Sequence, residues 1–186
     1  IGPEAAGSFE RAAASLANAV VQRVQRARQI LSEPEPEPIH FDSTGLAALR
    51  KWQMLDIRGT GKLDQVADAN GIQTLRIVAG PEGRCTASWR TRVVVPGGRY
   101  AFEGRVRTRG VVPLQKDVGT KGVGAGLRQS QRQARKHGLT GDNEWRQAEY
   151  EFTVPGESEE IALLCELRAE KGEVWFELAS LKLRKL

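Results

Sequence analysis

From Ile39 to Leu186 the chain alternates apolar and polar residues with a period of two, in short runs separated by Gly, Pro, Asn and Asp. This alternation is typical of half-buried β-strands, and no helical pattern lies between the runs. Many short strands joined by regular turns favour an all-β fold, a two-sheet antiparallel β-sandwich (jelly roll). The predicted strands are 39–42, 52–57, 73–78, 84–95, 99–110, 122–129, 145–154, 160–168 and 173–184. Turns are predicted at 80–81, 96–98, 141–143, 155–156 and 171–172.

The same alternation assigns each side chain to one face of its strand. The core positions are Val93, Val95, Tyr100, Phe102, Val106, Val123, Ala125, Leu127, Tyr150, Phe152, Val154, Ile161, Leu163, Leu167, Val174, Phe176 and Leu178. The opposite faces carry Arg90, Arg92, Glu103, Arg105, Arg107, Arg128, Glu166, Arg168, Trp175 and Glu177. Two features stand out there, because arginines outnumber acids and Trp175 is an aromatic residue on the outward side.

The first part of the chain follows a different pattern and predicts one N-terminal α-helix, within a domain spanning 1–32. Ser8 is a suitable N-cap, and no Gly or Pro occurs between it and Pro34. Apolar residues repeat at alternating spacings of four and three, as in a coiled-coil seam: Ala13, Ala17, Val20, Val24, Ala27 and Leu31. The seam is short, so three interpretations stay open: packing on its own protein, self-association, or binding at a membrane surface.

A Glu/Pro linker at 33–38 separates this helix from the strands at 39–186, because each Pro fixes its own φ and favours extended backbone before it. The chain has 186 residues, enough for one full domain and too few for two large ones. It begins Ile1-Gly2-Pro3, without a Met or a leader, which indicates a piece of a larger protein. No stretch approaches 18 apolar residues, so no membrane span is predicted.

The formal net charge of +5 permits an anionic partner without requiring one. Four cations lie between Arg128 and His137, a run that is either a solvated loop or a contact for phosphate or an acidic glycan. Cys85 and Cys165 match no zinc motif, and both lie in predicted strands. They are interpreted either as two small buried apolar residues or as one disulfide. His40 and His137 are interpreted as separate loop residues.

Three segments resemble carbohydrate-binding modules of the family 4/9/22 type, which have a galactose-binding-like jelly roll. They are TASWRTRVVVPGGRYAFEGRVRT (86–108), KGEVWFELASLKL (171–183) and IHFD (39–42). The resemblance is stronger to the subgroup appended to large bacterial multidomain proteins. It implies a non-catalytic module at the cell surface or otherwise outside the cytoplasm, and in many members a structural calcium. Asp42 would match the opening acid, and Glu177 stands where the family has a closing Asp. Calcium takes six to eight oxygens, so a salt bridge or exposed acids are the alternative for this pair.

No catalytic motif is complete. Gly61-Lys62 lacks the Ser/Thr of a phosphate loop, since Leu63 stands there, and Asp56 replaces its first Gly. The glycines at 122–126 lack the third Gly of a dinucleotide fingerprint, because Leu127 stands in its place. No GxSxG occurs. Binding without catalysis is therefore the predicted activity, and the protein is predicted not to be an enzyme.

Sugar rings present flat C–H faces that pack on aromatic rings, and their hydroxyls suit planar charged groups. Of the four tryptophans, Trp52 and Trp89 are predicted in the core, Trp145 either at the core edge or exposed, and Trp175 as a platform. The candidate ligand-binding residues are Trp175, Trp145, Arg90, Arg92, Arg105, Arg107, Arg128 and Glu166. The alternative is a structural ladder of arginines with Glu103, Glu149, Glu151 and Glu166.

The leading hypothesis is thus a carbohydrate-binding-like module that positions a larger bacterial protein on a polysaccharide or other glycan. Binding would use one exposed face or the loops at 113–121 and 129–144. One alternative is an assembly module that self-associates through the N-terminal helix. Another is anionic-polymer binding through Arg128, Arg132, Arg135 and Lys136. Nucleic acid is the less favoured polymer, because few aromatic residues interleave this run.

Overall fold

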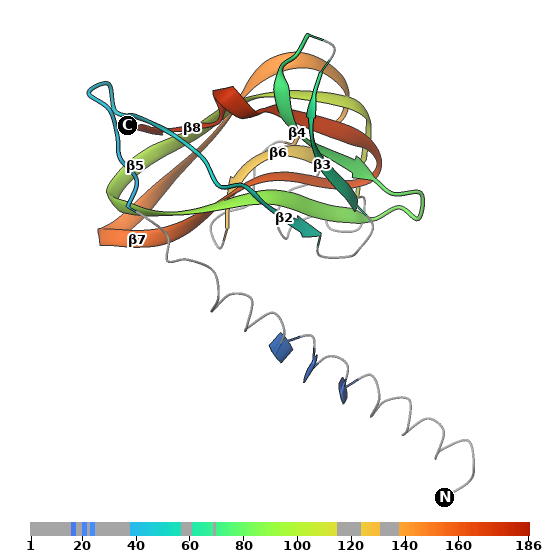
Figure 1. The fold of residues 1–186 in the computed structure, drawn as a ribbon, viewed down its shortest axis with the longest axis horizontal. Coiled ribbons are helices and arrows are strands. Elements are labelled where there is room, and N and C mark those ends of the chain that lie inside the picture. The colour runs from blue at the N-terminus through green and yellow to red at the C-terminus, as the bar shows by residue number, and fades with distance from the viewer. Residues whose placement is uncertain are drawn as a thin grey trace, which may run out of the picture. The chain divides into compact units, whose positions relative to one another are not determined.

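In the computed structural model, the chain forms two compact units, Ile1–Glu35 and Pro36–Leu186 (Figure 1). The structure describes residues 16–17, 20–21, 23–24, 38–56, 61–68, 70–114, 124–130 and 138–186. The described part of the second unit is built mainly of strands. They are β1 (Leu46–Ala48), β2 (Gln53–Asp56), β3 (Gly61–Ala67), β4 (Gln73–Ala79), β5 (Cys85–Pro113), β6 (Gly124–Gln129), β7 (Gly141–Glu177) and β8 (Lys182–Lys185), with one 3-10 turn at Leu178–Ser180.

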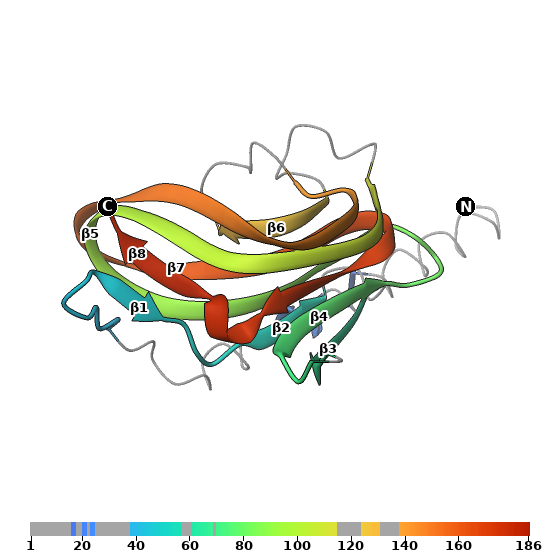
Figure 2. The ribbon, with the colours of Figure 1, turned by 90° about the horizontal axis from the view of Figure 1, so that it is seen from above.

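Two long strands, β5 and β7, organise this unit and appear as long curved ribbons in Figure 1. As residue numbers rise along β5, the numbers of the partners on β7 fall, so the two strands run antiparallel. Cys85 lies opposite Ala169 and Pro96 opposite Ser158; beyond that point Gly98 lies opposite Val154. The pairing offset therefore changes between residues 96 and 98. Figure 2 shows both ribbons turning back at the end of the unit that carries the C-terminus.

The bend folds one hydrogen-bonded sheet over on itself into two layers. The first, called here the β4 layer, holds β1, β8, β4, β3 and three long-strand segments: 98–113 of β5, and 141–154 and 171–177 of β7. The second, called here the β6 layer, holds β2, β6, residues 85–96 of β5 and residues 158–169 of β7. The predicted antiparallel β-sandwich is consistent with this arrangement.

The bend depends on a close approach of two backbones that only glycine allows. A Cβ atom on Gly97 would lie 1.8 Å from the carbonyl oxygen of Gly156, far inside van der Waals contact. Gly156 itself has a φ of 75°, a conformation that favours glycine. The residues at 96–98 and 155–156 were predicted as turns between separate strands. They are instead bends within continuous strands, and the same holds at 171–172.

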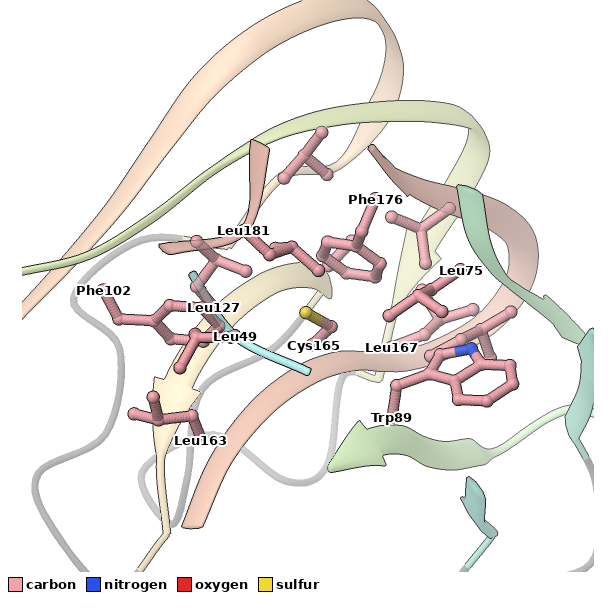
Figure 3. Packing of buried hydrophobic residues seen from close by; sticks show 14 of the residues in the cluster. Leu49, Leu75, Trp89, Phe102, Leu127, Leu163, Cys165, Leu167, Phe176 and Leu181 are labelled. Atoms are coloured by element: carbon pink, nitrogen blue, oxygen red, sulfur yellow. The ribbon is translucent and has the colours of Figure 1, made fainter. Parts of the chain in front are cut away.

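The inner faces of the two layers share one apolar core (Figure 3). Phe176 and Leu75 come from the β4 layer, whereas Leu163 and Leu167 come from the β6 layer. The indole Nε1 of Trp89, in the β6 layer, donates a hydrogen bond of 3.1 Å to the backbone oxygen of Arg76 in the β4 layer. The layers are therefore joined by packing and by a polar contact.

The predicted core is confirmed for most of its members. Fully or nearly buried are Val95, Tyr100, Phe102, Val106, Ala125, Leu127, Phe152, Val154, Ile161, Leu163, Leu167, Val174 and Phe176, while Val93, Tyr150 and Leu178 pack against the core from its border. Val123 lies outside the described residues. Of the two tryptophans predicted in the core, Trp89 is buried within it. Trp52 packs against the core from its border and stacks on Phe102, with ring centroids 6.3 Å apart.

Two parts of the strand prediction are wrong. Residues 39–42 form no strand, because the Asp42 side chain closes a local turn by accepting hydrogen bonds from the backbone N–H groups of Thr44 and Leu46. The strands β1 and β3 were not predicted. Both lie at the ends of the strand order, where a strand needs few apolar residues, and β3 follows a Gly-Thr-Gly sequence that resembles a loop.

The predicted N-terminal helix lies largely outside the described residues. Its described positions, 16–17, 20–21 and 23–24, are helical. Among the described residues, no helix has the length and apolar character that a membrane span requires. Both cysteines are buried free thiols, which supports the interpretation as small apolar residues rather than a disulfide. Burial and the nearby Asp56 carboxylate raise the pKa of Cys85 to about 12.

Candidate functional site

A line of charged and aromatic side chains crosses the outer face of the β4 layer. Its register runs from Asp64 on β3 to Arg76 on β4, then to Trp175 on β7 and Arg107 on β5. These side chains point outward because their chain neighbours point into the core: Val174 and Phe176 flank Trp175 and are fully buried. The alternation that predicted an outward Trp175 is therefore correct.

The aromatic rings and guanidinium groups of this face stack on each other. The Arg107 Cζ atom lies 4.6 Å from the ring centroid of Trp175 and 5.1 Å from that of Trp145. A second guanidinium lies over each ring: the Arg76 Cζ atom is 5.5 Å from the Trp175 centroid, and the Arg105 Cζ atom is 5.7 Å from the Trp145 centroid. Each such cation–π contact stabilises by about 0.5–2 kcal/mol. The five residues Arg76, Trp175, Arg107, Trp145 and Arg105 are called here the Trp–Arg row.

Carboxylates hold both ends of the Trp–Arg row. Glu173 accepts from Arg76 through Nε at 3.0 Å and Nη2 at 2.5 Å, and Asp64 lies 3.9 Å from the same guanidinium. Glu177 accepts from Arg105 at 3.0 Å. In the described part of the chain, Arg107 has no carboxylate partner. The face thus combines two indoles, three guanidiniums and three acids, all on strands.

The two tryptophans of the row differ in how open they are. Trp175 is only 8 % exposed, because guanidinium groups lie over its ring, so it does not form the open platform that was expected. Trp145 is half-buried. Its Nε1 atom is buried and has no acceptor among the described residues. Trp145 is therefore the more accessible ring of the pair.

The other predicted binding residues lie on the outer face of the β6 layer. Arg90 and Arg92 are on the 85–96 segment of β5, Arg128 is on β6, and Glu166 is on β7. The shared core separates that face from the Trp–Arg row. The structure brings together Trp175, Trp145, Arg105 and Arg107, and it does not bring the remaining four to them.

The charged residues of the β6 layer pair with one another. The Arg128 guanidinium donates through Nε and Nη2 to both oxygens of Glu166, each at 3.0 Å, and Arg168 Nε lies 3.4 Å from Glu166 Oε2. Arg92 donates through Nε to Glu160 at 2.6 Å. The contacts of Glu166 agree with the structural ladder that was the alternative interpretation, whereas Glu160 was not among the acids predicted for it. Because Arg128 is buried and paired with Glu166, it is unsuited to bind an anionic polymer. The other residues predicted for that role, Arg132, Arg135 and Lys136, lie outside the described residues.

The two residues that would hold calcium are each engaged by their own chain. Asp42 Oδ1 accepts hydrogen bonds from the backbone N–H and the hydroxyl of Thr44 and from the backbone of Leu46, which lowers the pKa of Asp42. Glu177 pairs with Arg105. The described residues contain no group of three or more His, Cys, Asp or Glu placed to hold a metal ion. The contacts of Asp42 and Glu177 therefore do not fit a shared calcium site, and calcium binding stays a prediction that these two residues do not support.

Three members of the face were missed in the sequence: Arg76, Glu173 and Asp64. The signal for Arg76 was available, because its neighbours Leu75 and Ile77 are apolar and fully buried, which places Arg76 on the outward side of β4. No sequence signal indicated that β4 pairs with the last segment of β7, and that pairing alone brings Arg76 next to Trp175.

No family model matches the sequence, and no curated protein is similar to it. The fold is similar to that of solved carbohydrate-binding modules. One is the family 61 module TmCBM61 in complex with β-1,4-galactotriose, at 12% identity and a TM-score of 0.44, covering 74% of this chain and 91% of that one. Another is the family 11 module from Clostridium thermocellum in complex with a β-1,3-1,4-mixed-linked tetrasaccharide, at 14% identity and a TM-score of 0.34, covering 77% and 98%.

A third likeness is to the family 11 module of the cellulosomal cellulase Lic26A-Cel5E of Clostridium thermocellum. It has 14% identity and a TM-score of 0.33, and it covers 83% of this chain and 97% of that one. The family 4/9/22 type that the sequence resembles is not among these three structures. The choice of a ligand for this chain therefore rests on the contacts of the Trp–Arg row itself.

Proposed function

We propose that residues 39–186 form a non-catalytic module that binds a glycan on the outer face of the β4 layer, through the Trp–Arg row. The observation that carries the proposal is the row itself, in which Trp145 and Trp175 alternate with arginines across neighbouring strands. Rigid strands hold these side chains, so the surface is formed before a ligand arrives, which lowers the entropic cost of binding.

The chemistry of the row suits a sugar. An indole packs against the C–H face of a pyranose ring, and guanidinium and carboxylate groups offer paired donors and acceptors to its hydroxyls. Trp145 supplies the accessible ring. Arg107 and Arg105 supply donors beside that ring, and Glu177 supplies an acceptor next to Arg105.

The arrangement favours binding over turnover. Each carboxylate beside the row is held by an arginine, which fixes its position and balances its charge. A glycosidase would instead place two carboxyl groups on either side of the scissile bond. A module of this kind would position a larger bacterial protein on a polysaccharide, at the cell surface or elsewhere outside the cytoplasm.

The direct test is retention of the protein on immobilised neutral and acidic polysaccharides, compared between wild type and Trp145→Ala. The control is Met54→Ala, which removes an exposed apolar side chain from β2 in the other layer. We expect Met54→Ala to bind like wild type and Trp145→Ala to lose at least tenfold in affinity, with both variants folded by circular dichroism. Equal retention of all three proteins, or no retention on any polysaccharide, would contradict the proposal.

A second candidate function is assembly through the N-terminal helix. The described apolar residues Leu16, Val20 and Val24 share one helical face and are each at least 45% exposed within the chain. Burial of that face against a second copy would give a dimer. Light scattering of the full chain and of a chain lacking residues 1–38 tests this, and a monomer in both cases would remove the candidate.

A further inference from the structure

The arginines of the Trp–Arg row are not equally neutralised. Arg76 is bound by Glu173 and lies near Asp64, and Arg105 is bound by Glu177. Arg107, at the centre of the row, stacks on the two indoles, and within the described residues its N–H groups donate to no acceptor. The centre of the face therefore carries a positive charge that no described carboxylate balances.

The surroundings of Arg107 strengthen this charge. Indole rings displace water from the guanidinium without accepting its N–H bonds, so an anion there would meet less screening than at an exposed arginine. Arg105 and Arg109 lie two residues away on either side along β5, and the alternation of the strand places them on the same face. Arg109 is exposed. The charge of Arg105 is balanced by Glu177, so Arg109 is the neighbour that adds positive charge beside the central arginine.

We infer that the Trp–Arg row recognises an acidic saccharide, with the Arg107 guanidinium binding a carboxylate or sulfate group of the sugar while Trp145 packs against its ring. The inference deepens the proposed function and rests on it. A guanidinium presents parallel N–H donors that match the two oxygens of a carboxylate, a fit that a neutral hydroxyl does not provide. A neutral glycan would leave the central charge of the face unmatched.

The test uses a pair of ligands that differ only in charge: polygalacturonate and its fully methyl-esterified form, each included in native affinity gels. Heparin provides a sulfated arm, and β-1,4-galactan provides a neutral arm. The protein variants are Arg107→Gln and Arg99→Gln. Arg99→Gln is the control, because it removes the same charge from the same strand outside the row. The Arg99 side chain is 69% exposed, and its guanidinium lies 3.6 Å from the Glu151 carboxylate.

We expect at least tenfold tighter binding to polygalacturonate than to the esterified polymer, and a loss of at least tenfold in Arg107→Gln but not in Arg99→Gln. Arg107→Lys, which keeps the charge and loses the planar fork, should fall between Arg107→Gln and wild type. It also serves as the test variant should Arg107→Gln fail to fold. Tighter binding of heparin than of polygalacturonate, with the same loss in Arg107→Gln, would assign the anion as sulfate and support the inference.

The failures are distinguishable. Binding to galactan and esterified polymer as tight as binding to polygalacturonate would overturn the acidic ligand and leave glycan binding intact. Equal losses in Arg107→Gln and Arg99→Gln would show general attraction to a basic protein and overturn the role of Arg107. Absence of binding to every polymer would overturn the proposed function together with the inference.

Discussion

Replacing Glu166 by Gln should destabilise the fold strongly, because it removes the acid that neutralises two buried arginines. Glu166 is 2 % exposed and accepts from Arg128 through both oxygens, each at 3.0 Å. Arg168 lies 3.4 Å from one of those oxygens. Gln has nearly the same shape as Glu, so packing is preserved. The charge is lost, and one of the two acceptor oxygens becomes an NH2 donor that faces an arginine N–H group.

The size of the effect follows from burial. Removing one partner of a buried ion pair costs about 3–5 kcal/mol, because the remaining charge stays desolvated and unpaired. Arg128 and Arg168 are both nearly buried, which places the expected loss in that range. A domain is stable by only about 5–15 kcal/mol, so Glu166→Gln should lose roughly a fifth or more of its free energy of unfolding.

The matched control is Glu160→Gln on the same strand. Glu160 also pairs with an arginine, Arg92, but its side chain is 41% exposed whereas that of Glu166 is 3% exposed. Exposed pairs contribute about 0–1 kcal/mol. Urea unfolding, with its slope fitted independently, measures both variants; for a slope of about 2 kcal/mol/M, the Glu166→Gln midpoint should fall by about 2 M. Equal midpoints for the two variants would refute the reasoning.

Three further outcomes are expected. Gly97→Ala should lower the free energy of unfolding by about 2 kcal/mol or more, because the new methyl would meet the Gly156 carbonyl. The control Gly71→Ala, whose methyl meets nothing within 4 Å, should lower it by about 1 kcal/mol. Equal losses in the two variants would contradict the close backbone approach at the bend. Folding raises the pKa of Cys85 from 9.0 to about 12, so the unfolded state releases its proton first and stability should fall as pH rises through this range. Burial raises the pKa of Cys165 as well, so Cys85→Ala should flatten that fall in part in urea titrations. The melting temperature should be the same in EDTA and in millimolar calcium, and a rise with calcium would restore the predicted metal site.

The core could be predicted from the sequence because burial on one face imposes a period of two on each strand. Val106, Leu167 and Phe152 are examples, since all three lie between polar neighbours and are buried. Strands at the edge escape this rule. β1 and β3 pair on one side only, so their residues carry a weaker apolar pattern and were missed.

The candidate site could be predicted only in part. Alternation correctly assigned Trp175, Arg107 and Arg90 to outward faces, but it does not say which layer a strand joins. Residues 85–96 and 98–113 belong to one continuous strand that bends between layers, so Arg90 and Arg107 lie on opposite faces of the sandwich. The bend is fixed by backbone contacts at Gly97 and Gly156, which are distant in sequence. Both positions were predicted as turns, but nothing in the sequence indicates that the strand continues through the turn into the other layer.

The four tryptophans allow a direct test of where the ligand binds. Their indole N–H resonances can be followed by NMR during titration with the polysaccharide that is retained best. The account predicts that Trp145 shifts most and Trp175 next, because both lie in the Trp–Arg row, and that Trp52, which stacks on Phe102 in the core, stays unchanged. Saturable shifts confined to Trp52 and Trp89, or saturable binding with no shift of Trp145, would contradict binding on this face.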